Sequence, residues 1–398
     1  MKKLMQVGFV AVALVAPLAQ GAGFGLYEGS ARGNALGGTL VGRADDPSAV
    51  FYNPAGITQL PGDQFMGGLT VVTPMTDVTI GGVKTSAERN WWYLPHAYYT
   101  HDFNDKVWAG MGVYSRFGLG TEFPENWPGR YNSYFASIKS LTLNPNVAVK
   151  LTDKLSVAAG FDAVYFDMDL KRKVPVSGVG DVPVELKGDA WGYGFNLAAR
   201  YAINDWIAIG GTYIAKVRED VSGTASAGPN STGASGQIEL PQEGAIALLL
   251  KPMDKLSVEF AVTATGWTSY DRLGVTFDNP AVLGPETSSP KDWKNAFRYQ
   301  AGVEYEATRS LVVRAGYIYD EEPIPAATAD YIVPANDRHL LSTGIGYRWN
   351  SWVLDLSYTY LIIIDRSIPG HVPPDGVMPS DISGGNAHMI GLSVSTKL

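Results

Sequence analysis

Side chains capable of nucleophilic or acid–base chemistry are sparse in this chain and poorly spaced for it. The histidines are His96, His101, His339, His371 and His388. None belongs to an HExxH zinc motif, and His388 and Ser393 lie an odd number of residues apart on one expected strand, so their side chains face opposite sides. The GxGxG of residues 21–25 follows an export signal and not a strand, so it is no nucleotide loop. Because the chain also has no cysteine, we expect no enzyme, no cofactor and no metal site.

Two cations could instead bind the carboxylate of an apolar ligand, which would be costly to bury without a partner. They are Lys216 and Arg298, on inward faces of expected strands. Interior charges often pair with one another, and Glu304 and Asp355 are available as partners. The segment YFDMDLKRK (165–173) carries acidic residues where a carboxylate site would favour a base. A neutral hydrocarbon therefore stays open as the ligand.

Apolar side chains offer a second kind of binding surface. In the run 155–170, one face would meet lipid, and the opposite face would line an apolar interior with Val164, Phe166 and Met168. Aromatic residues also surround the motif PENWPGRY, namely Phe123, Trp127, Tyr131, Tyr134 and Phe135. This aromatic loop is either a first capture groove, to which Trp127 and Tyr131 would contribute, or a rigid cap.

The N-terminus predicts export. Lys2 and Lys3 precede an apolar run over residues 7–18, and small residues follow at 19–21, as in a secretory signal peptide. We expect residues 1–21 to be removed. The formal net charge of −8 argues against a nucleic-acid partner, because such binding requires cationic surface.

Composition and alternation then predict how the exported chain is arranged. No later segment is apolar for the length of a spanning helix, yet the chain contains 21 Tyr and 10 Trp with only 18% charged residues. Segments such as 352–360 alternate aromatic or aliphatic residues with mostly polar ones. A soluble sandwich also alternates, but it rarely ends one strand after another in Tyr or Trp, whereas membrane barrels carry aromatic girdles. We predict a transmembrane β-barrel.

Connection lengths give the strand number. Short turns are expected at residues 103–106, 152–154, 203–205, 252–255, 307–309 and 349–351. Longer loops are expected near residues 75–90, 119–133, 174–185, 221–236, 279–291, 321–336 and 366–384. This alternation is typical of outer-membrane barrels and gives about fourteen antiparallel strands over residues 63–398.

Residues 22–62 are expected to fill the barrel as a compact plug, or hatch. The segment is glycine-rich and lacks sustained alternation, so it is a poor strand. A disordered tail would be more polar, whereas Val50, Phe51, Tyr52 and Ile57 need a protein interior.

Three segments, in order, resemble the FadL family of outer-membrane transporters for long-chain fatty acids, which includes TodX-like channels for aromatic hydrocarbons. They are AGFGLYE from Ala22, NPAG at Asn53 to Gly56, and SRFGLGTEF at Ser115 to Phe123. The resemblance extends over the chain in strand number and order. It implies a 14-stranded barrel closed by an N-terminal hatch, a kinked third strand, and lateral release of an apolar ligand into the outer-membrane lipid.

The resemblance also assigns residues. It places the kink at Ser115, Gly118 and Gly120, with Phe117 and Leu119 at the opening. It places Ala22, Gly23 and Phe24 near the ligand, and Asn53, Pro54 and Ala55 in the hatch core. Leu398 departs from the pattern, because such barrels more often end in an aromatic residue.

The sequence therefore predicts a monomeric outer-membrane barrel of a Gram-negative bacterium that takes up hydrophobic small molecules passively. Long-chain fatty acids are the first candidate ligands and aromatic hydrocarbons the second, since apolar pockets discriminate weakly between chains and rings. Exit through the hatch is the alternative to lateral exit. A structural or adhesin-like barrel without transport is the remaining alternative.

Overall fold

The computed structural model describes residues 23–371 and 376–398. The predicted signal peptide (1–21) and Ala22 lie outside the described residues. Among the residues that are described, no helix is long and apolar enough to cross a membrane.

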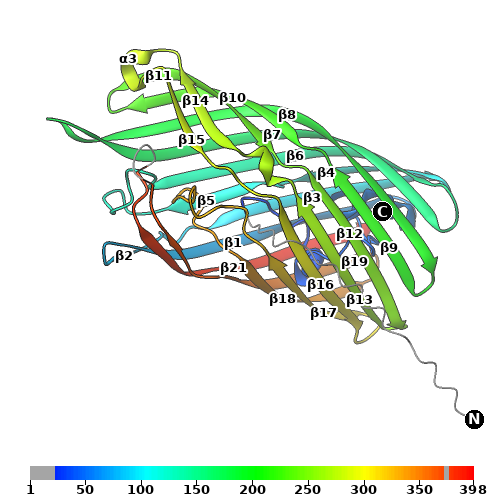
Figure 1. Ribbon diagram of the computed structural model, residues 1–398. Helices are drawn as coiled ribbons and strands as arrows, with labels where there is room; N and C mark the ends of the chain where they lie inside the picture. The colour runs from blue at the N-terminus through cyan, green and yellow to red at the C-terminus, as the bar shows by residue number, and fades with distance from the viewer. Residues whose placement is uncertain (1–22, 372–375) are drawn as a thin grey trace, which may run out of the picture.

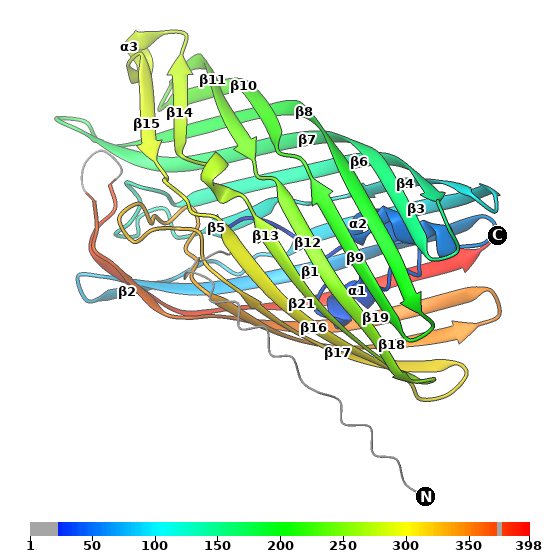
Figure 2. The same ribbon diagram turned by 45° about the vertical axis from the view of Figure 1, so that its right-hand side comes forward.

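The described chain forms a closed antiparallel barrel of 14 strands, as predicted. Closure comes from β1 (Gln64–Ile80), which pairs with β3 (Trp92–Asn104) on one side and with β21 (Ser380–Lys397), the last strand of the chain, on the other. Closing the sheet satisfies the backbone hydrogen bonds of its edges, which an open sheet in lipid could not do. Figures 1 and 2 show the tilted strands wrapped around the N-terminal segment.

Interruptions divide several of the 14 strands into two segments. The first half of the barrel contains, besides β1 and β3, the segments β2 (Val83–Ser86), β4 (Val107–Tyr114), β5 (Gly118–Glu122), β6 (Phe135–Lys150), β7 (Leu155–Val176), β8 (Gly180–Asn204), β9 (Ile207–Ile214) and β10 (Val217–Ala227). The second half contains β11 (Asn230–Leu240), β12 (Glu243–Met253), β13 (Leu256–Thr265), β14 (Arg272–Phe277), β15 (Glu286–Pro290), β16 (Ala296–Glu306), β17 (Leu311–Asp320), β18 (Arg338–Trp349), β19 (Trp352–Ile363) and β20 (Arg366–Ile368). Two short helices lie outside the hatch, η2 (Trp267–Ser269) and α3 (Pro280–Leu283).

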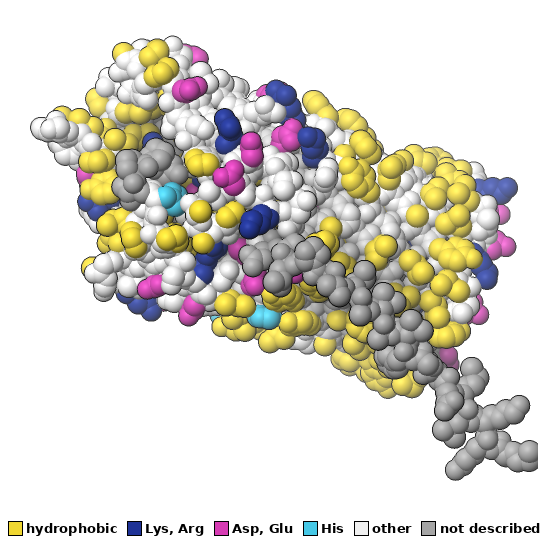
Figure 3. Space-filling view, viewed as in Figure 1, with side chains coloured by type: hydrophobic (Ala, Val, Ile, Leu, Met, Phe, Trp, Pro, Cys, Tyr) yellow, Lys and Arg dark blue, Asp and Glu magenta, His cyan; other side chains and the backbone are white. Residues whose placement is uncertain are grey.

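The alternation of the sequence sets which side chains face outward. Trp352, Leu354, Leu356 and Tyr358 are all exposed on β19, whereas Asp355 between them is buried. Figure 3 shows hydrophobic side chains over much of the right-hand half of the wall, with charged side chains at the right-hand edge and over the middle and left of the view. The outer wall is therefore apolar where a bilayer would surround it.

All six predicted short turns are confirmed. Three of the segments predicted as long loops are wrong, because they are mostly strand. Residues 174–185 and 221–236 belong mostly to long hairpins, in which β7 pairs with β8 and β10 pairs with β11, and residues 75–80 continue β1. Figure 1 shows these hairpins projecting beyond the rest of the wall. Their Gly, Pro and Ser content hid an alternation that continues, and pairing with the neighbouring strand satisfies their backbone groups.

The hatch segment, residues 23–62, lies within the barrel. It contains α1 (Ala31–Ala35), α2 (Ala49–Tyr52) and η1 (Pro54–Gln59), and these three elements are buried almost throughout. Ser30 caps α1 by accepting a hydrogen bond from the Gly33 N–H. The hatch elements contact strands on several sides of the barrel. They lie toward the end that bears the short turns, at the right in Figure 2, which we call the lower half.

Candidate ligand-binding site

A cavity of about 540 Å³ lies above the hatch, within the usual range of small-molecule sites. Its walls come from the hatch residues 23–28, from β1 and β3, from the interrupted third strand, and from the loop after β17. Most of the lining is apolar, with Phe24, Leu26, Val72, Met75, Leu94, Phe117, Ile138, Val333, Leu361 and Met389 among the residues that contribute. Such a cavity suits a hydrophobic ligand.

The third strand breaks where the resemblance places the kink. β4 ends at Tyr114, β5 begins at Gly118, and Ser115, Gly118 and Gly120 all line the cavity. Upper β3, residues 92–96, pairs with β1 but with no residue of β5, so the wall is unpaired beside the kink. The backbone of Leu119 belongs to β5, but its side chain lies outside the described part of the structure.

The hatch is joined directly to the kink. The Leu26 N–H donates to the Arg116 carbonyl at 2.7 Å, and the Gly118 N–H donates to the Phe24 carbonyl at 2.9 Å. Gly25 and Phe117 form an isolated antiparallel bridge between these two bonds. A shift of the first hatch residues would therefore release the backbone of the kink.

Trp92 lies across the inner side of the unpaired wall. A Cβ built on Gly120 would come within 1.9 Å of the Trp92 indole, so only glycine leaves room for the ring. The indole N–H has no hydrogen-bond partner among the described residues. The ring therefore occupies the gap by packing alone.

An aromatic cluster holds Phe24 against the cavity. Its ring lies 4.8 Å from Trp267, 5.7 Å from Tyr270 and 5.6 Å from Trp293, measured between centroids. The pairs with Trp267 and Tyr270 are edge-to-face, and such pairs add about 0.5–1.5 kcal/mol each. Gly23 permits this packing, because its φ is +45° and a Cβ there would lie 2.5 Å from the Trp267 ring.

Five charged residues are among those that line the cavity. They are Glu28, Glu88, Glu122, Lys139 and Arg338. Arg338 donates to Asp320 at 2.5 Å, and Glu122 accepts a hydrogen bond from Asn90 at 2.7 Å. Lys139 forms no ion pair among the described residues.

The two predicted cations do not line this cavity. Lys216 has a side chain that is 55% exposed and pairs with Glu239 at 2.9 Å. Arg298 pairs with Glu243 at 3.4 Å and stacks over the Tyr27 ring at 4.3 Å. Lys216 and Arg298 are thus both paired with carboxylates of the protein. The cations that line the cavity are Lys139 and Arg338.

The predicted aromatic loop has the structure of a cap. Trp127 is buried, stacks on Phe123 at 4.1 Å and contacts Tyr331 at 4.9 Å. The Tyr331 hydroxyl donates to the Met378 carbonyl, which joins three loops. Tyr131 accepts a hydrogen bond from Arg130 at 2.7 Å. In this conformation neither Trp127 nor Tyr131 borders the cavity.

The predicted apolar face of β7 is buried as expected. Val164, Phe166 and Met168 are 2%, 0% and 4% exposed and belong to the upper core. None of the three borders the 540 Å³ cavity, so they pack the interior wall beside it.

Below the cavity, charged groups join the hatch to the wall. Glu304 accepts hydrogen bonds from Arg32 and Arg43, both at 2.9 Å, and from Arg314 at 2.6 Å. Arg314 also donates to Asp355 at 2.6 Å. Glu304 and Asp355 thus pair with arginines inside the barrel, as the sequence allowed. These arginines are Arg32, Arg43 and Arg314, and not Arg298.

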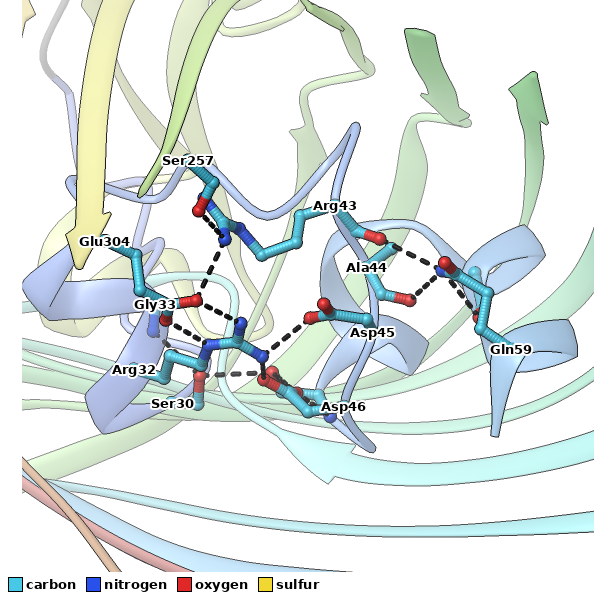
Figure 4. Close-up of polar contacts among 12 residues, drawn as sticks. Ser30, Arg32, Gly33, Arg43, Ala44, Asp45, Asp46, Gln59, Ser257 and Glu304 are labelled. Carbon is cyan, nitrogen blue, oxygen red and sulfur yellow. Dashed lines mark hydrogen bonds and ion pairs between the residues drawn. The ribbon is translucent and has the colours of Figure 1, made fainter. Parts of the chain in front are cut away.

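Figure 4 shows how the hatch completes this ion cluster. The Arg32 guanidinium donates to Asp45 at 2.7 Å and to Asp46 at 2.9 Å, while its other edge faces Glu304. A buried arginine requires such complete pairing, since a lone buried charge is costly. The cluster therefore fixes the position of the hatch.

Asn53 serves the hatch itself. Its side-chain oxygen accepts the Ala55 N–H, and its amide donates to the carbonyls of Val41 at 2.6 Å and Ala199 at 3.0 Å. Pro54 occupies the first turn of η1, where its missing N–H costs nothing. The NPA residues are therefore explained by capping and wall contacts.

One serine–histidine pair was missed because it is formed across strands. His96 and Ser393 are both register partners of Gly68, and His96 Nε2 lies 2.9 Å from Ser393 Oγ. Ser393 Oγ accepts the Ala31 N–H from α1 at 2.8 Å, and His96 Nδ1 has no partner among the described residues. The His96 ring stacks on Tyr98 with centroids 5.9 Å apart, and the Ser393 hydroxyl joins it to α1, so this pair is explained by its contact with the hatch helix.

The sequence matches a known protein family over almost its whole length. Residues 12–397 match the model of a family described as outer membrane protein transport protein (OMPP1/FadL/TodX). The chain belongs to this family. Its members are transport proteins of the outer membrane, which is accordingly the location of this chain.

Relatives of the OMPP1/FadL/TodX family cover most of the chain. The long-chain fatty acid transport protein of Escherichia coli O6:H1 is 28% identical over 405 residues, covering 88% of this chain and 89% of the relative. Outer membrane protein P1 of Haemophilus influenzae is 26% identical over 415 residues, covering 88% of each.

Solved structures of the family share the fold. A Pseudomonas aeruginosa FadL homologue superposes with a TM-score of 0.83 at 20% identity, covering 94% of this chain and 100% of that one. The Pseudomonas putida toluene transporter TodX gives 0.72 at 19% identity, covering 95% and 98%. The predicted 14-stranded barrel agrees with both.

Sequence reasoning missed most of the aromatic cluster. Trp267, Tyr270 and Trp293 lie where strands are interrupted, at η2 and in residues 291–295. The signal was available, because GWTSYD breaks the alternation between two good strands. Trp92 and Lys139 carried no such signal, since their importance depends on the neighbouring kink.

Proposed function

We propose that this transport protein takes up hydrophobic small molecules passively from outside the cell, with long-chain fatty acids as its main ligands. The observation that carries the proposal is the apolar cavity of about 540 Å³. Its wall includes the kink and the first hatch residues, which are hydrogen-bonded to each other. The E. coli relative named as a long-chain fatty acid transport protein supports this choice of ligand.

Aromatic hydrocarbons are the second candidate ligands. The aromatic cluster around Phe24 offers ring surfaces to a ring-shaped ligand, and the acidic residues that line the cavity would not attract a carboxylate. The structural likeness to a toluene transporter is compatible with this alternative.

We infer a lateral route out of the cavity. The ion cluster and the packed hatch helices obstruct the way down, whereas upper β3 and β5 are not paired with each other beside the kink. The Trp92 ring packs there, and a backbone hydrogen bond from the Glu88 N–H to the Glu122 carbonyl at 2.7 Å bridges to the far end of β5. The ligand would enter the cavity, displace residues 23–26 from the kink and leave between β3 and β5 into the membrane. The barrel would act as a monomer and without catalysis or cofactor.

Uptake of labelled oleate and labelled toluene tests the ligand. The host cells lack their own carriers, and an empty vector gives the background. Oleate uptake alone supports a fatty-acid transporter, and toluene uptake alone supports a hydrocarbon channel. Uptake of neither supports a structural barrel without transport.

Gly118→Trp tests the route. A Cβ on Gly118 would lie 2.8 Å from Leu26 Cδ1, so a Trp side chain would fill the opening. We expect uptake to fall to the empty-vector level. The control is Gly274→Trp, because no atom lies within 4 Å of a Cβ there. Unchanged uptake by an assembled Gly118→Trp barrel would exclude lateral exit.

A further inference from the structure

On the outer face of β6, β7 and β8, apolar side chains give way to charged ones between two successive rows of outward-facing residues. One row of register partners is Leu141, Tyr165 and Trp191. The next outward row is Lys139, Asp167 and Asp189. Aromatic girdles lie at the edge of the hydrocarbon layer in membrane barrels, so the outer membrane boundary falls between these two rows.

Lys139 stands at this boundary and also at the kink. It is exposed, it lines the cavity, and its register partner on β5 is the kink residue Gly118. Lys139 is therefore the point where the apolar cavity meets the charged outer surface.

Unlike the neighbouring lysines, Lys139 forms no ion pair with a carboxylate among the described residues. On the same outer face, Lys171 pairs with Glu185 at 3.1 Å and Lys187 pairs with Glu185 at 2.7 Å. Asp167 is the cross-strand partner of Lys139, yet no ion pair joins them within the described residues. Arg338, the other cation at the cavity, already holds Asp320.

We propose that Lys139 binds the negatively charged head of an amphiphilic ligand at the mouth of the cavity, while the apolar tail lies in the cavity or the bilayer. The inference rests on the proposed function and adds the residue that would hold the carboxylate of the ligand. An ammonium at the boundary keeps its own hydration, so it can pair with a carboxylate that is never buried. This arrangement reconciles an anionic ligand with the acidic residues that line the cavity.

The test compares labelled oleate with labelled oleyl alcohol, which has the same chain and a neutral head. Uptake is measured in carrier-deficient cells that express the wild-type chain, Lys139→Gln, Lys139→Arg or the control Lys187→Gln. We expect Lys139→Gln to lower oleate uptake about fivefold, the effect of one cation near a membrane surface. Oleyl alcohol uptake should not change, Lys139→Arg should restore oleate uptake, and Lys187→Gln should match the wild type.

The outcomes separate this inference from the proposed function. If the wild-type chain takes up neither probe, the proposed function fails and the inference fails with it. If the wild type takes up oleate and Lys139→Gln is unaffected, Lys139 has no such role although transport stands. An equal loss of both probes would also overturn it, because that result indicates contact with a lipid phosphate or a structural role. The amount of folded barrel in the outer membrane is measured for every variant.

Discussion

The lower and upper halves of the barrel interior are filled in opposite ways. Below, the hatch is held by charged groups such as Arg32, Arg314 and Glu304, all of them buried and paired. Above, the rings of Phe24 and Trp92 pack against the cavity with no side-chain hydrogen bond among the described residues, and backbone hydrogen bonds join the first hatch residues to the kink. Directional contacts have one satisfactory geometry, whereas aromatic packing tolerates displacement. The same segment, residues 23–62, is therefore anchored by buried ion pairs in the lower half and is easier to displace at the kink.

The largest effect should come from breaking the lower half. Glu304→Ala leaves Arg32, Arg43 and Arg314 without their shared carboxylate. We expect the free energy of unfolding to fall by about 3–5 kcal/mol, as for other buried pairs broken on one side. Urea unfolding of the purified barrel in detergent measures the change.

Glu306→Ala is the matched control for this prediction. Glu306 lies on the same strand and pairs with Arg348, but both side chains are about 40% exposed. Its loss should cost less than about 1 kcal/mol. Equal effects of the two substitutions would mean that the ion cluster does not anchor the hatch.

A smaller effect should follow from crowding the hatch against the wall. A Cβ on Gly316 would lie 2.2 Å from the Gly37 nitrogen and 2.4 Å from the Leu36 carbonyl carbon. Because backbone must move to make room, Gly316→Val should destabilise the barrel by about 2 kcal/mol. Gly244→Val is the control, since the nearest atom to its Cβ is 3.9 Å away. Thermal unfolding of both variants, followed by circular dichroism, would reveal whether the close contact matters.

In the upper half, the expected effect is on ligand affinity. Phe24→Ala removes apolar surface from the cavity wall, and we expect oleate to bind roughly tenfold more weakly, equivalent to about 1.4 kcal/mol. The free energy of unfolding should change less than in Glu304→Ala. Displacement of a fluorescent fatty acid from purified protein measures the affinity. Phe65→Ala, on the exposed outer wall, should bind as the wild type does.

The smallest expected effect concerns a loop over the cavity. Burial raises the pKa of Glu322 to about 8, against the opposing influence of Arg366. The protonated form is therefore favoured by the folded loop, and its stabilising contribution is present at low pH and lost as pH rises toward 8. We expect limited proteolysis within residues 321–337 to become several-fold faster between pH 6 and pH 9. Glu322→Gln should abolish this pH dependence, and an unchanged dependence would implicate another group.

The sequence by itself determined the barrel. Alternation with a period of two is a local property, and short turns need only a few residues, so strand number and the outward faces could be read directly. The place of the kink came from the family resemblance of SRFGLGTEF, and the strand breaks at residues 115–117, whereas Gly118 and Gly120 themselves pair within β5.

Only the tertiary structure decided which side chains meet inside. Glu304 and Arg32 are 272 positions apart, and no spacing rule joins a hatch residue to a strand so distant in the chain. Lys216 and Arg298 were plausible cations for the ligand, but the structure engages them with Glu239 and Glu243. Lys139 became notable only because β5 sets the kink beside it. Pairing across a closed barrel depends on register and tilt, which the pattern along one strand does not contain.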